Sequence, residues 1–375
     1  MSDVSVAMDS AGRYWSTHPS LSGDFLEKFD GTADEVVLIA RQGTDAGATT
    51  PLPEGTRVLP LPAAGRRQGY RGVLKLARSV LSCRFEAADT VFVRIPELLG
   101  FLFWMRTKFS PAHVVANVVA EAGSWFPQGS KHPLVSRALS TTLESFSRVV
   151  VRRSDAVVYV TQESLQRRYG TRAPALAMTN ARLPESWLTV DPAPISPSLR
   201  HLITVGHLNG GVKGIDILLR AFSAVVRRGL PDATLTIVGA GDPEVFLEMA
   251  QQLGVADRVR FTGEITDRRK LLELLRSHDL FVLASRSEGL PRAMIEAMCL
   301  GLPSIGSRVG GVEELVGRRW SFDKEDDVAL AALLLSAEPH EGRVALSQQQ
   351  LARARAIIAQ AQGAPLANFF QSLKE

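Results

Sequence analysis

Cysteine is scarce in this sequence. The chain has 375 residues but only two cysteines, Cys83 and Cys299. They lie far apart, and neither has a histidine or a second cysteine nearby, so neither a disulfide framework nor a zinc site is expected. This cysteine usage favours a reducing, cytoplasmic environment.

Segments that would target the chain to a membrane, or anchor it there, are also lacking. The first nine residues contain an acid in place of a basic cluster and have no apolar core, so they do not match a secretory signal. The longest apolar stretch of the first half, residues 98–105, is far below the roughly 20 residues that a spanning helix needs. No membrane span is predicted.

The chain has no large excess of charge of one sign. It contains 43 Lys and Arg against 39 Asp and Glu, which gives a formal net charge of +4. This excess is too small to indicate a nucleic-acid-binding protein, so no nucleic-acid partner is expected. The chain is also 45% apolar, which argues against disorder and allows more than one buried core.

Short β-branched runs alternate with longer helical patterns along most of the chain. This alternation is typical of stacked βαβ units around a parallel sheet and predicts an α/β fold. In the first half, strands are predicted at residues 4–8, 35–40, 90–94, 113–119 and 156–160, and helices at 70–85, 135–153 and 163–168. In the second half, strands are predicted at 201–205, 233–238, 259–261, 280–284 and 304–306, and helices at 214–228, 243–253, 268–277 and 292–300.

Four prolines, Pro184, Pro192, Pro194 and Pro197, lie close together in mid-chain. Such a density cannot continue a helix or a central strand, so residues 186–198 are expected to form a linker. The linker would separate two Rossmann-like, doubly wound domains, residues 1–185 and 199–355, and a C-terminal helix at 356–375 could pack back on the first domain. Because such sheets bind ligands outside the carboxyl ends of their strands, a site is expected in the cleft between the domains.

A glycine-rich loop follows the first strand of the second domain. It contains Gly206, Gly210, Gly211 and Gly214 and ends in a helix that starts near Ile215. Glycines let the backbone approach a phosphate, the amino end of the helix offers N–H groups, and Lys213 adds a countercharge. Considered alone, the same glycines also fit a tight strand-to-helix turn without a ligand.

A second segment, residues 287–303, carries two acids at the start of a helix. Pro291 suits a first helical position, with Glu288 in the preceding turn and Glu296 inside the helix. Glu288 could accept hydrogen bonds from sugar hydroxyls, Glu296 could hold a vicinal diol, and the N–H groups of Gly289 and Leu290 could face a phosphate. Most helical glutamates are instead solvated, because an unpaired buried carboxylate is costly.

Five segments together resemble a known family. They are Val-Gly-His-Leu at 205–208 with Lys-Gly at 213–214, Ile-Val-Gly-Ala-Gly at 237–241, Val-Arg-Phe-Thr-Gly-Glu at 259–264, Asp-Leu-Phe-Val-Leu-Ala-Ser-Arg-Ser-Glu-Gly-Leu-Pro at 279–291, and Glu-Ala-Met-Cys-Leu-Gly-Leu-Pro at 296–303. Their order is similar to that in retaining glycosyltransferases of the GT-B fold, the family called glycosyltransferase group 1 or family four. All five lie in the second domain.

The resemblance implies a nucleotide-sugar site in the second domain. Lys213 would contact the pyrophosphate, Glu296 the ribose diol, and Glu288 the donor sugar, with Glu288 and Lys213 as the catalytic pair. The remaining donor-side positions would be Gly206, His207, Gly263, Glu264, Gly289, Leu290 and Pro291, with the base near Gly263 and Glu264. His207 departs from the family, which usually has an arginine there, and a histidine reaches less far and is only partly charged near neutral pH.

The implied reaction needs no bound metal and no cofactor besides the sugar nucleotide. Lys213, the glycine-rich loop and the amino end of the helix would stabilise the leaving phosphate by preorganised electrostatics. The sequence contains no Asp-x-Asp, the motif with which sugar transferases of the other common fold hold a divalent ion.

The resemblance implies transfer of a sugar from a UDP-, GDP- or ADP-sugar to a glycan or lipid-linked acceptor, in bacterial surface polysaccharide synthesis by family analogy. Two alternatives stay open, namely a sugar-nucleotide epimerase or phosphorylase of the same fold, and a non-catalytic partner in glycan assembly.

The first domain would hold the acceptor, but its pattern is less specific. Relatives have a double-glycine loop after the first strand, whereas this chain has only Gly12 there. Asp9 and Arg13 follow that strand, and Glu121 follows the 113–119 strand near a usual family histidine. These three residues are the predicted acceptor contacts.

The basic residues gather between Arg66 and Arg84, where no acid occurs. On the predicted helix, Arg71, Lys75 and Arg78 share a face opposite the apolar residues Val73, Ala77, Val80 and Leu81. Such a helix could rest on an anionic membrane surface and would make the protein peripheral on the inner face of the cell membrane. An ordinary solvated surface helix is slightly favoured over this interpretation.

Overall fold

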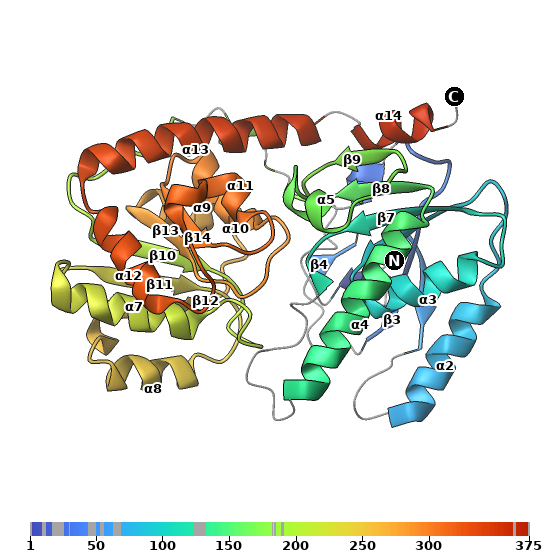
Figure 1. The fold of residues 1–375 in the computed structure, drawn as a ribbon, viewed down its shortest axis with the longest axis horizontal. Coiled ribbons are helices and arrows are strands. Elements are labelled where there is room, and N and C mark those ends of the chain that lie inside the picture. Colours follow the sequence, from blue (N-terminus) through green and yellow to red (C-terminus); the bar gives the residue numbers. More distant parts are fainter. Residues whose placement is uncertain are drawn as a thin grey trace.

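The structure is a computed structural model in which two domains lie side by side (Figure 1). It describes residues 2–9, 13–16, 26–29, 31–43, 50–52, 56–62, 69–122, 133–181, 183, 185–188, 191–362 and 365–373.

The N-terminal domain contains a five-stranded and a four-stranded sheet. The first has the order β4-β2-β1-β3-β5 and the second β6-β7-β8-β9. Strand β2 runs antiparallel to β1 and β4, and the remaining pairs are parallel. The strands are β1 Ser2–Met8, β2 Tyr14–Ser16, β3 Val37–Gln42, β4 Thr50–Pro51, β5 Arg57–Leu61, β6 Thr90–Ile95, β7 His113–Val118, β8 Ala156–Tyr159 and β9 Ala175–Ala177. The helices are η2 Glu27–Phe29, α2 Gly69–Ser82, α3 Leu98–Thr107, α4 Pro133–Arg152, α5 Ser164–Arg168 and α6 Glu185–Leu188.

The C-terminal domain is built on one parallel six-stranded sheet of order β12-β11-β10-β13-β14-β15. Its strands are β10 His201–Val205, β11 Thr234–Val238, β12 Val259–Gly263, β13 Leu280–Leu283, β14 Ser304–Ser307 and β15 Ser321–Phe322. The helices are α7 Ile215–Arg228, α8 Glu244–Gln252, η4 Ala256–Arg258, α9 Arg268–Arg276, α10 Arg292–Cys299, α11 Val312–Val316, η5 Arg318–Trp320, α12 Asp327–Ser336, α13 His340–Ala361 and α14 Pro365–Ser372. The predicted α/β class with parallel sheets is confirmed.

Local chemistry explains where these elements begin. The side chain of Asp267 accepts hydrogen bonds from the backbone N–H groups of Arg269 and Lys270 and so caps α9, and Asp326 caps α12 in the same way through Ala329. Strand β13, Leu-Phe-Val-Leu, is buried along its whole length, as expected for a central strand covered on both faces.

Helix α3 was not predicted. Most of its residues are buried, including Leu99, Phe103 and Trp104. A helix covered on most sides needs no polar face, so its sequence lacks the 3.6-residue alternation that identifies a surface helix. Among the described helices, none is long and apolar enough to cross a membrane.

Residues 356–375, expected to form one helix, are divided between two. Helix α13 begins at His340 and ends at Ala361, and α14 begins at Pro365. Proline lacks an N–H and suits the first position of a new helix, which explains the division. Helix α6 likewise occupies the start of the region expected to be linker.

Helices α13 and α14 connect the C-terminal domain with the four-stranded sheet of the N-terminal domain (Figure 1). Gln350 of α13 hydrogen-bonds through its side chain to the backbone N–H and carbonyl of Ser304 in β14. Ala361, at the end of α13, and Leu366 of α14 are buried in a cluster with Val115 of β7 and Val158 of β8. The end of the chain therefore lies against the first domain.

A polar contact joins the two domains at α5 and α11. The carboxylate of Glu314 accepts hydrogen bonds from the backbone N–H groups of Gln162, at 2.8 Å, and Glu163, at 3.1 Å, and from that of Ser164. The hydroxyl of Ser164 donates to the carbonyl of Gly310 at 2.7 Å. Glu314 thus caps the first turn of a helix that belongs to the other domain.

We predict that Glu314→Ala loosens the contact between the domains. Loss of a cap of this kind costs about 1 kcal/mol, and this cost falls on the interface rather than on either core. Small-angle X-ray scattering of the variant should show a larger radius of gyration at unchanged helix content. Glu313→Ala is the matched control, since the preceding acid makes none of these bonds. An unchanged radius for Glu314→Ala would contradict the prediction.

Candidate active site

The predicted donor-side residues lie at the carboxyl ends of adjacent strands of the C-terminal sheet. The backbone N–H of Gly206 donates to Val238 at 2.8 Å, and that of Gly239 to Gly263 at 2.9 Å, so three strand ends lie side by side. A Cβ on Gly239 would be 2.0 Å from the carbonyl oxygen of Gly206. Glycine is required there for the backbones to approach.

The end of the glycine-rich loop packs closely against the residue that follows β13. Gly214 has a φ of +60°, and a Cβ there would lie 2.0 Å from the carbonyl oxygen of Ala284. A Cβ on Gly206 would be 2.8 Å from Cγ and Cδ of Lys213, so the lysine stem lies across this glycine. Both glycines are needed to hold Lys213 in place.

Lys213 and Glu288 form the ion pair at the centre of this region. Nζ of Lys213 lies 2.7 Å from Oε1 of Glu288, and the two side chains are 25% and 10% exposed. The hydroxyl of Ser285 donates to the same oxygen at 2.6 Å. Within the described part of the chain these contacts use only Oε1, which leaves Oε2 of Glu288 to accept from another group.

Gly289 brings this pair next to the N-terminal domain. A Cβ on Gly289 would lie 1.8 Å from the carbonyl oxygen of Val119, which directly follows β7. The carbonyl of Gly289 accepts from the N–H of Gly311 at 2.7 Å. Leu290 and Pro291 are buried and lead into α10.

Glu296 lies on α10 among buried apolar neighbours, including Ile295, Ala297 and Met298. Part of the residue remains accessible, but burial raises the pKa of its carboxyl above the ordinary 4.5, against the opposing charges of Arg292 and Arg268. Such an acid is costly to ionise unless a ligand donates hydrogen bonds to it.

Two other predicted donor-side residues, His207 and Glu264, are exposed at the strand ends. Gly263, the last residue of β12, has a φ of +73°. The structure therefore places the predicted donor-side residues along one edge of one sheet, while their individual contacts with a donor stay predictions.

The predicted acceptor residues are not gathered in the same way. Asp9, just after β1, and Arg13, just before β2, bond to each other, with Nε of Arg13 3.0 Å from Oδ2 of Asp9. Oε2 of Glu121 lies 3.6 Å from Nη1 of Arg168. Of the three, only Glu121 lies in the short segment that follows Val119 and so near Gly289.

Two residues of this region were not singled out from the sequence. Arg286, between the serines at 285 and 287, binds the glycine-rich loop, and Glu314 joins the domains. No sequence signal identifies either, because both depend on segments that are distant along the chain. Among the described residues, no group of three or more His, Cys, Asp or Glu is arranged to hold a metal ion.

Known proteins resemble this chain in sequence and in fold. Residues 200–337 match a family model described as glycosyl transferases group 1. The protein CapJ of Staphylococcus aureus is 27% identical over 260 residues, which cover 68% of this chain and 64% of CapJ. The chain thus spans less than two thirds of the length of CapJ, and about a third of the next two curated relatives.

Two solved structures share the fold. Sucrose-phosphate synthase from Thermosynechococcus elongatus has a TM-score of 0.71 at 18% identity, covering 93% of this chain and 91% of the other. HepE of Anabaena, solved in complex with UDP, has a TM-score of 0.57 at 17% identity, covering 89% and 92%.

The C-terminal domain therefore belongs to the glycosyl transferases group 1 family. The chain as a whole has the GT-B fold, which confirms the predicted fold class, and the predicted family is matched over residues 200–337.

We predict that Glu296→Gln stabilises the free protein at neutral pH. Because burial raises the pKa of Glu296, its ionised form costs folding free energy above the ordinary pKa, and this cost is relieved as the pH falls. Glutamine is never charged, so the variant should have the higher thermal midpoint at pH 7. The difference should shrink as the pH approaches 4.5, the ordinary value. Calorimetric scans across this range test it, and an unchanged or lower midpoint at pH 7 would contradict it.

Proposed function

We propose that this chain is a retaining glycosyltransferase that moves a sugar from a nucleotide diphosphate sugar to a glycan or lipid-linked acceptor. The second domain would bind a UDP-, GDP- or ADP-sugar. The family match over residues 200–337 and the UDP bound in a protein of the same fold support the donor class. A role in bacterial surface polysaccharide synthesis rests on family analogy alone.

The single observation that carries this proposal is the Lys213–Glu288 pair at 2.7 Å, held between a glycine-rich loop and the start of α10. A lysine at a helix amino end attracts a diphosphate, and a half-free carboxylate beside it can accept from sugar hydroxyls. Both groups already stand in place, so little reorganisation is needed as charge develops on the leaving phosphate.

The same groups account for a reaction without a bound metal. The lysine charge and the first N–H groups of α7 and α10 would take over the stabilisation of the leaving group that a divalent ion otherwise gives. Glu296 would hold the ribose diol, because two hydroxyl donors compensate a buried carboxylate.

The acceptor would enter from the N-terminal side. Val119 approaches Gly289 closely, so a group beside Glu121 would lie near the proposed donor residues. Asp9 and Arg13 stay proposed acceptor contacts at the end of β1.

We predict that Lys213→Ala removes donor binding and transfer while the fold is retained. Wild-type protein should show a thermal shift with one of UDP, GDP or ADP and with its sugar, because a bound ligand raises the midpoint as its concentration exceeds the dissociation constant. Transfer should persist in excess chelator.

Lys270→Ala, at an exposed lysine of α9, is the matched control and should behave as wild type. Transfer by Lys213→Ala at the wild-type rate would overturn the site. Phosphorolysis, or nucleotide release without an acceptor, would favour the alternative enzyme classes. Absence of any nucleotide shift in the wild type would favour a non-catalytic partner.

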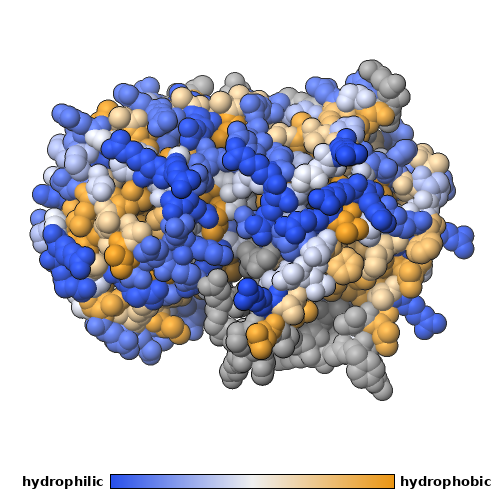
Figure 2. Space-filling view, in the orientation of Figure 1, coloured by the Kyte–Doolittle hydropathy of each residue, from blue (hydrophilic) through white to orange (hydrophobic). Residues whose placement is uncertain are grey.

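We also propose that one face of the N-terminal domain rests on an anionic membrane. Helices α2, α3 and α4 are neighbours, and Figure 2 shows hydrophobic side chains gathered over them, interspersed with hydrophilic ones. The exposed large apolar residues of these helices are Leu74 and Leu81 of α2, Leu98 and Met105 of α3, and Leu134, Leu139, Phe146 and Val149 of α4. Exposed basic residues on the same helices include Lys75, Arg78 and Arg137.

The structure changes the expected face of α2. Val80 is buried, as predicted for the apolar side, but Leu81 is 65% exposed and would face the bilayer together with the basic residues. Residues 66–68, part of the basic run, lie outside the described residues, as does the side chain of Arg71.

We predict that Leu134→Asp with Phe146→Asp releases the protein from anionic vesicles. Each change places a charge on an exposed apolar position of α4, which weakens apolar insertion and repels acidic headgroups. Co-sedimentation with phosphatidylglycerol vesicles measures it, with Val245→Asp, at an exposed apolar position of α8 in the other domain, as the control. Equal binding by the double variant and the wild type would contradict the membrane proposal.

A further inference from the structure

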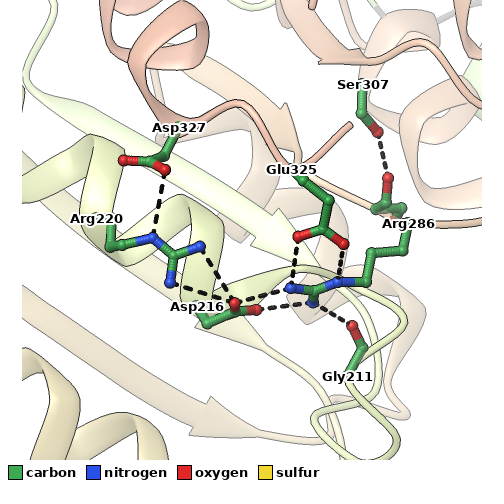
Figure 3. Close-up of polar contacts among 8 residues, drawn as sticks. Gly211, Asp216, Arg220, Arg286, Ser307, Glu325 and Asp327 are labelled. Atoms are coloured by element: carbon green, nitrogen blue, oxygen red, sulfur yellow. Dashed lines mark hydrogen bonds and ion pairs between the residues drawn. The ribbon is translucent and has the colours of Figure 1, made fainter. Parts of the chain in front are cut away.

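Arg286 lies at the centre of a polar cluster beside the glycine-rich loop (Figure 3). Its guanidinium donates to both carboxylate oxygens of Asp216, each at 2.8 Å. It also donates to both oxygens of Glu325, at 2.5 and 2.9 Å. Asp216 is in the first turn of α7, and Glu325 lies in the turn between β15 and α12.

The same side chain binds the loop backbone. Nη1 of Arg286 donates to the carbonyl of Gly211 at 2.6 Å. The backbone N–H of Arg286 donates to the carbonyl of Val212 at 2.7 Å. The next residue in the loop is Lys213. Two residues after Arg286, the chain reaches Glu288, the partner of that lysine.

These contacts use the guanidinium fully. An arginine has five N–H donors. Four of them form bidentate pairs with the carboxylates of Asp216 and Glu325, and the fifth donates to the carbonyl of Gly211. Its charge is opposed by two acids at contact distance. Arg286 is therefore arranged to hold protein groups together and has no donor left for a phosphate.

The cluster also holds a strained residue. Glu325 has a φ of +68° and is the one non-glycine residue with a positive φ in the described part of the chain. Such a conformation persists where surrounding contacts fix it, and the two bonds from Arg286 supply them. Although burial opposes it, hydrogen bonding from Arg286 holds the pKa of Asp216 below its ordinary value, so the pair stays ionised at neutral pH.

Resting on the donor site proposed above, we propose that Arg286 is a positioning residue that fixes the glycine-rich loop, and with it Lys213, in the conformation that receives the diphosphate. It acts through the carbonyls of Gly211 and Val212 and through Asp216 and Glu325, and it does not bind the donor itself.

The variants follow from this geometry. Arg286→Gln removes the charge and the fork, while Arg286→Lys keeps the charge but cannot bridge two carboxylates and a carbonyl. If Arg286 positions the loop, both variants should bind the diphosphate at least about tenfold more weakly, since small misplacements of a binding group are costly. If Arg286 were a phosphate ligand, lysine would restore binding, and this result would overturn the proposal.

Arg220→Gln is the matched control. Arg220 is ion-paired to the same Asp216 and to Asp327, each at 3.4 Å, and within the described residues it makes no hydrogen bond to the loop. Removing it takes away one positive charge from the same cluster (Figure 3). The affinity of Arg220→Gln for the diphosphate should stay near that of the wild type.

The first measurement needs no ligand. Hydrogen exchange of the amides of residues 209–214 should be faster in Arg286→Gln and Arg286→Lys than in the wild type and Arg220→Gln. Unchanged exchange in the Arg286 variants would overturn the positioning role whatever the protein binds.

The second measurement is calorimetric titration, below the thermal midpoint of each variant, with whichever of UDP, GDP and ADP shifts the wild type most. Loss of affinity restricted to the Arg286 variants supports the role. Equal affinity of all variants overturns it, because a residue that only stabilises the fold would lower the midpoint without weakening binding. Failure of all three nucleotides to bind the wild type would overturn the proposed function, while the exchange experiment still decides the role of Arg286 in the loop.

Discussion

The short ion pair between Lys213 and Glu288 joins two loops that leave neighbouring strands of the C-terminal sheet. Opposite charges at contact distance attract strongly only where water is partly excluded, and here both side chains are largely covered. The surrounding glycines allow this cover, since any side chain at Gly206 would collide with the lysine stem. The packing of the strand ends and the charge of the site therefore depend on each other.

The site is also tied to the contact between the domains. Gly289, next to the ion-paired glutamate, lies directly against the end of β7, and the carbonyl of Gly310 in the neighbouring loop accepts from Ser164 of the first domain. A change in the angle between the domains would therefore displace residues that lie one or two positions from Glu288. Binding and domain closure would share these contacts.

The sequence predicted the second domain well as far as β14 but missed α11, β15, α12 and the first part of α13, and it predicted the first domain less completely. In the C-terminal half, each predicted strand and helix overlaps an observed one, because buried strands there alternate with helices that have clear apolar faces. The missed helix α3 is apolar nearly all round, so its pattern carries no period. The short strands β2, β4 and β9 are two or three residues long, too short for alternation to show.

The donor-side residues could be found because the motif is local, with Glu288, Gly289 and Pro291 nearly consecutive. The cluster around Arg286 could not, because its partners Gly211, Asp216 and Glu325 come from three separate segments. Their proximity follows from the strand order, which places β10 next to β13, and strand order is a property of the folded sheet. Long-range polar contacts of this kind become visible only in three dimensions.

The chain passes between the domains twice, once after β9 and again where α13 runs on towards α14. The first passage is fastened to the C-terminal domain, because the buried side chain of Arg343, near the start of α13, donates to the carbonyls of Ser196 and Pro197. Residues 196 and 197 therefore move with the C-terminal domain, and the first connection is shorter than the chain between β9 and β10. Any change in the angle between the two halves must then be taken up before Ser196 in the first passage and after Ala361 in the second.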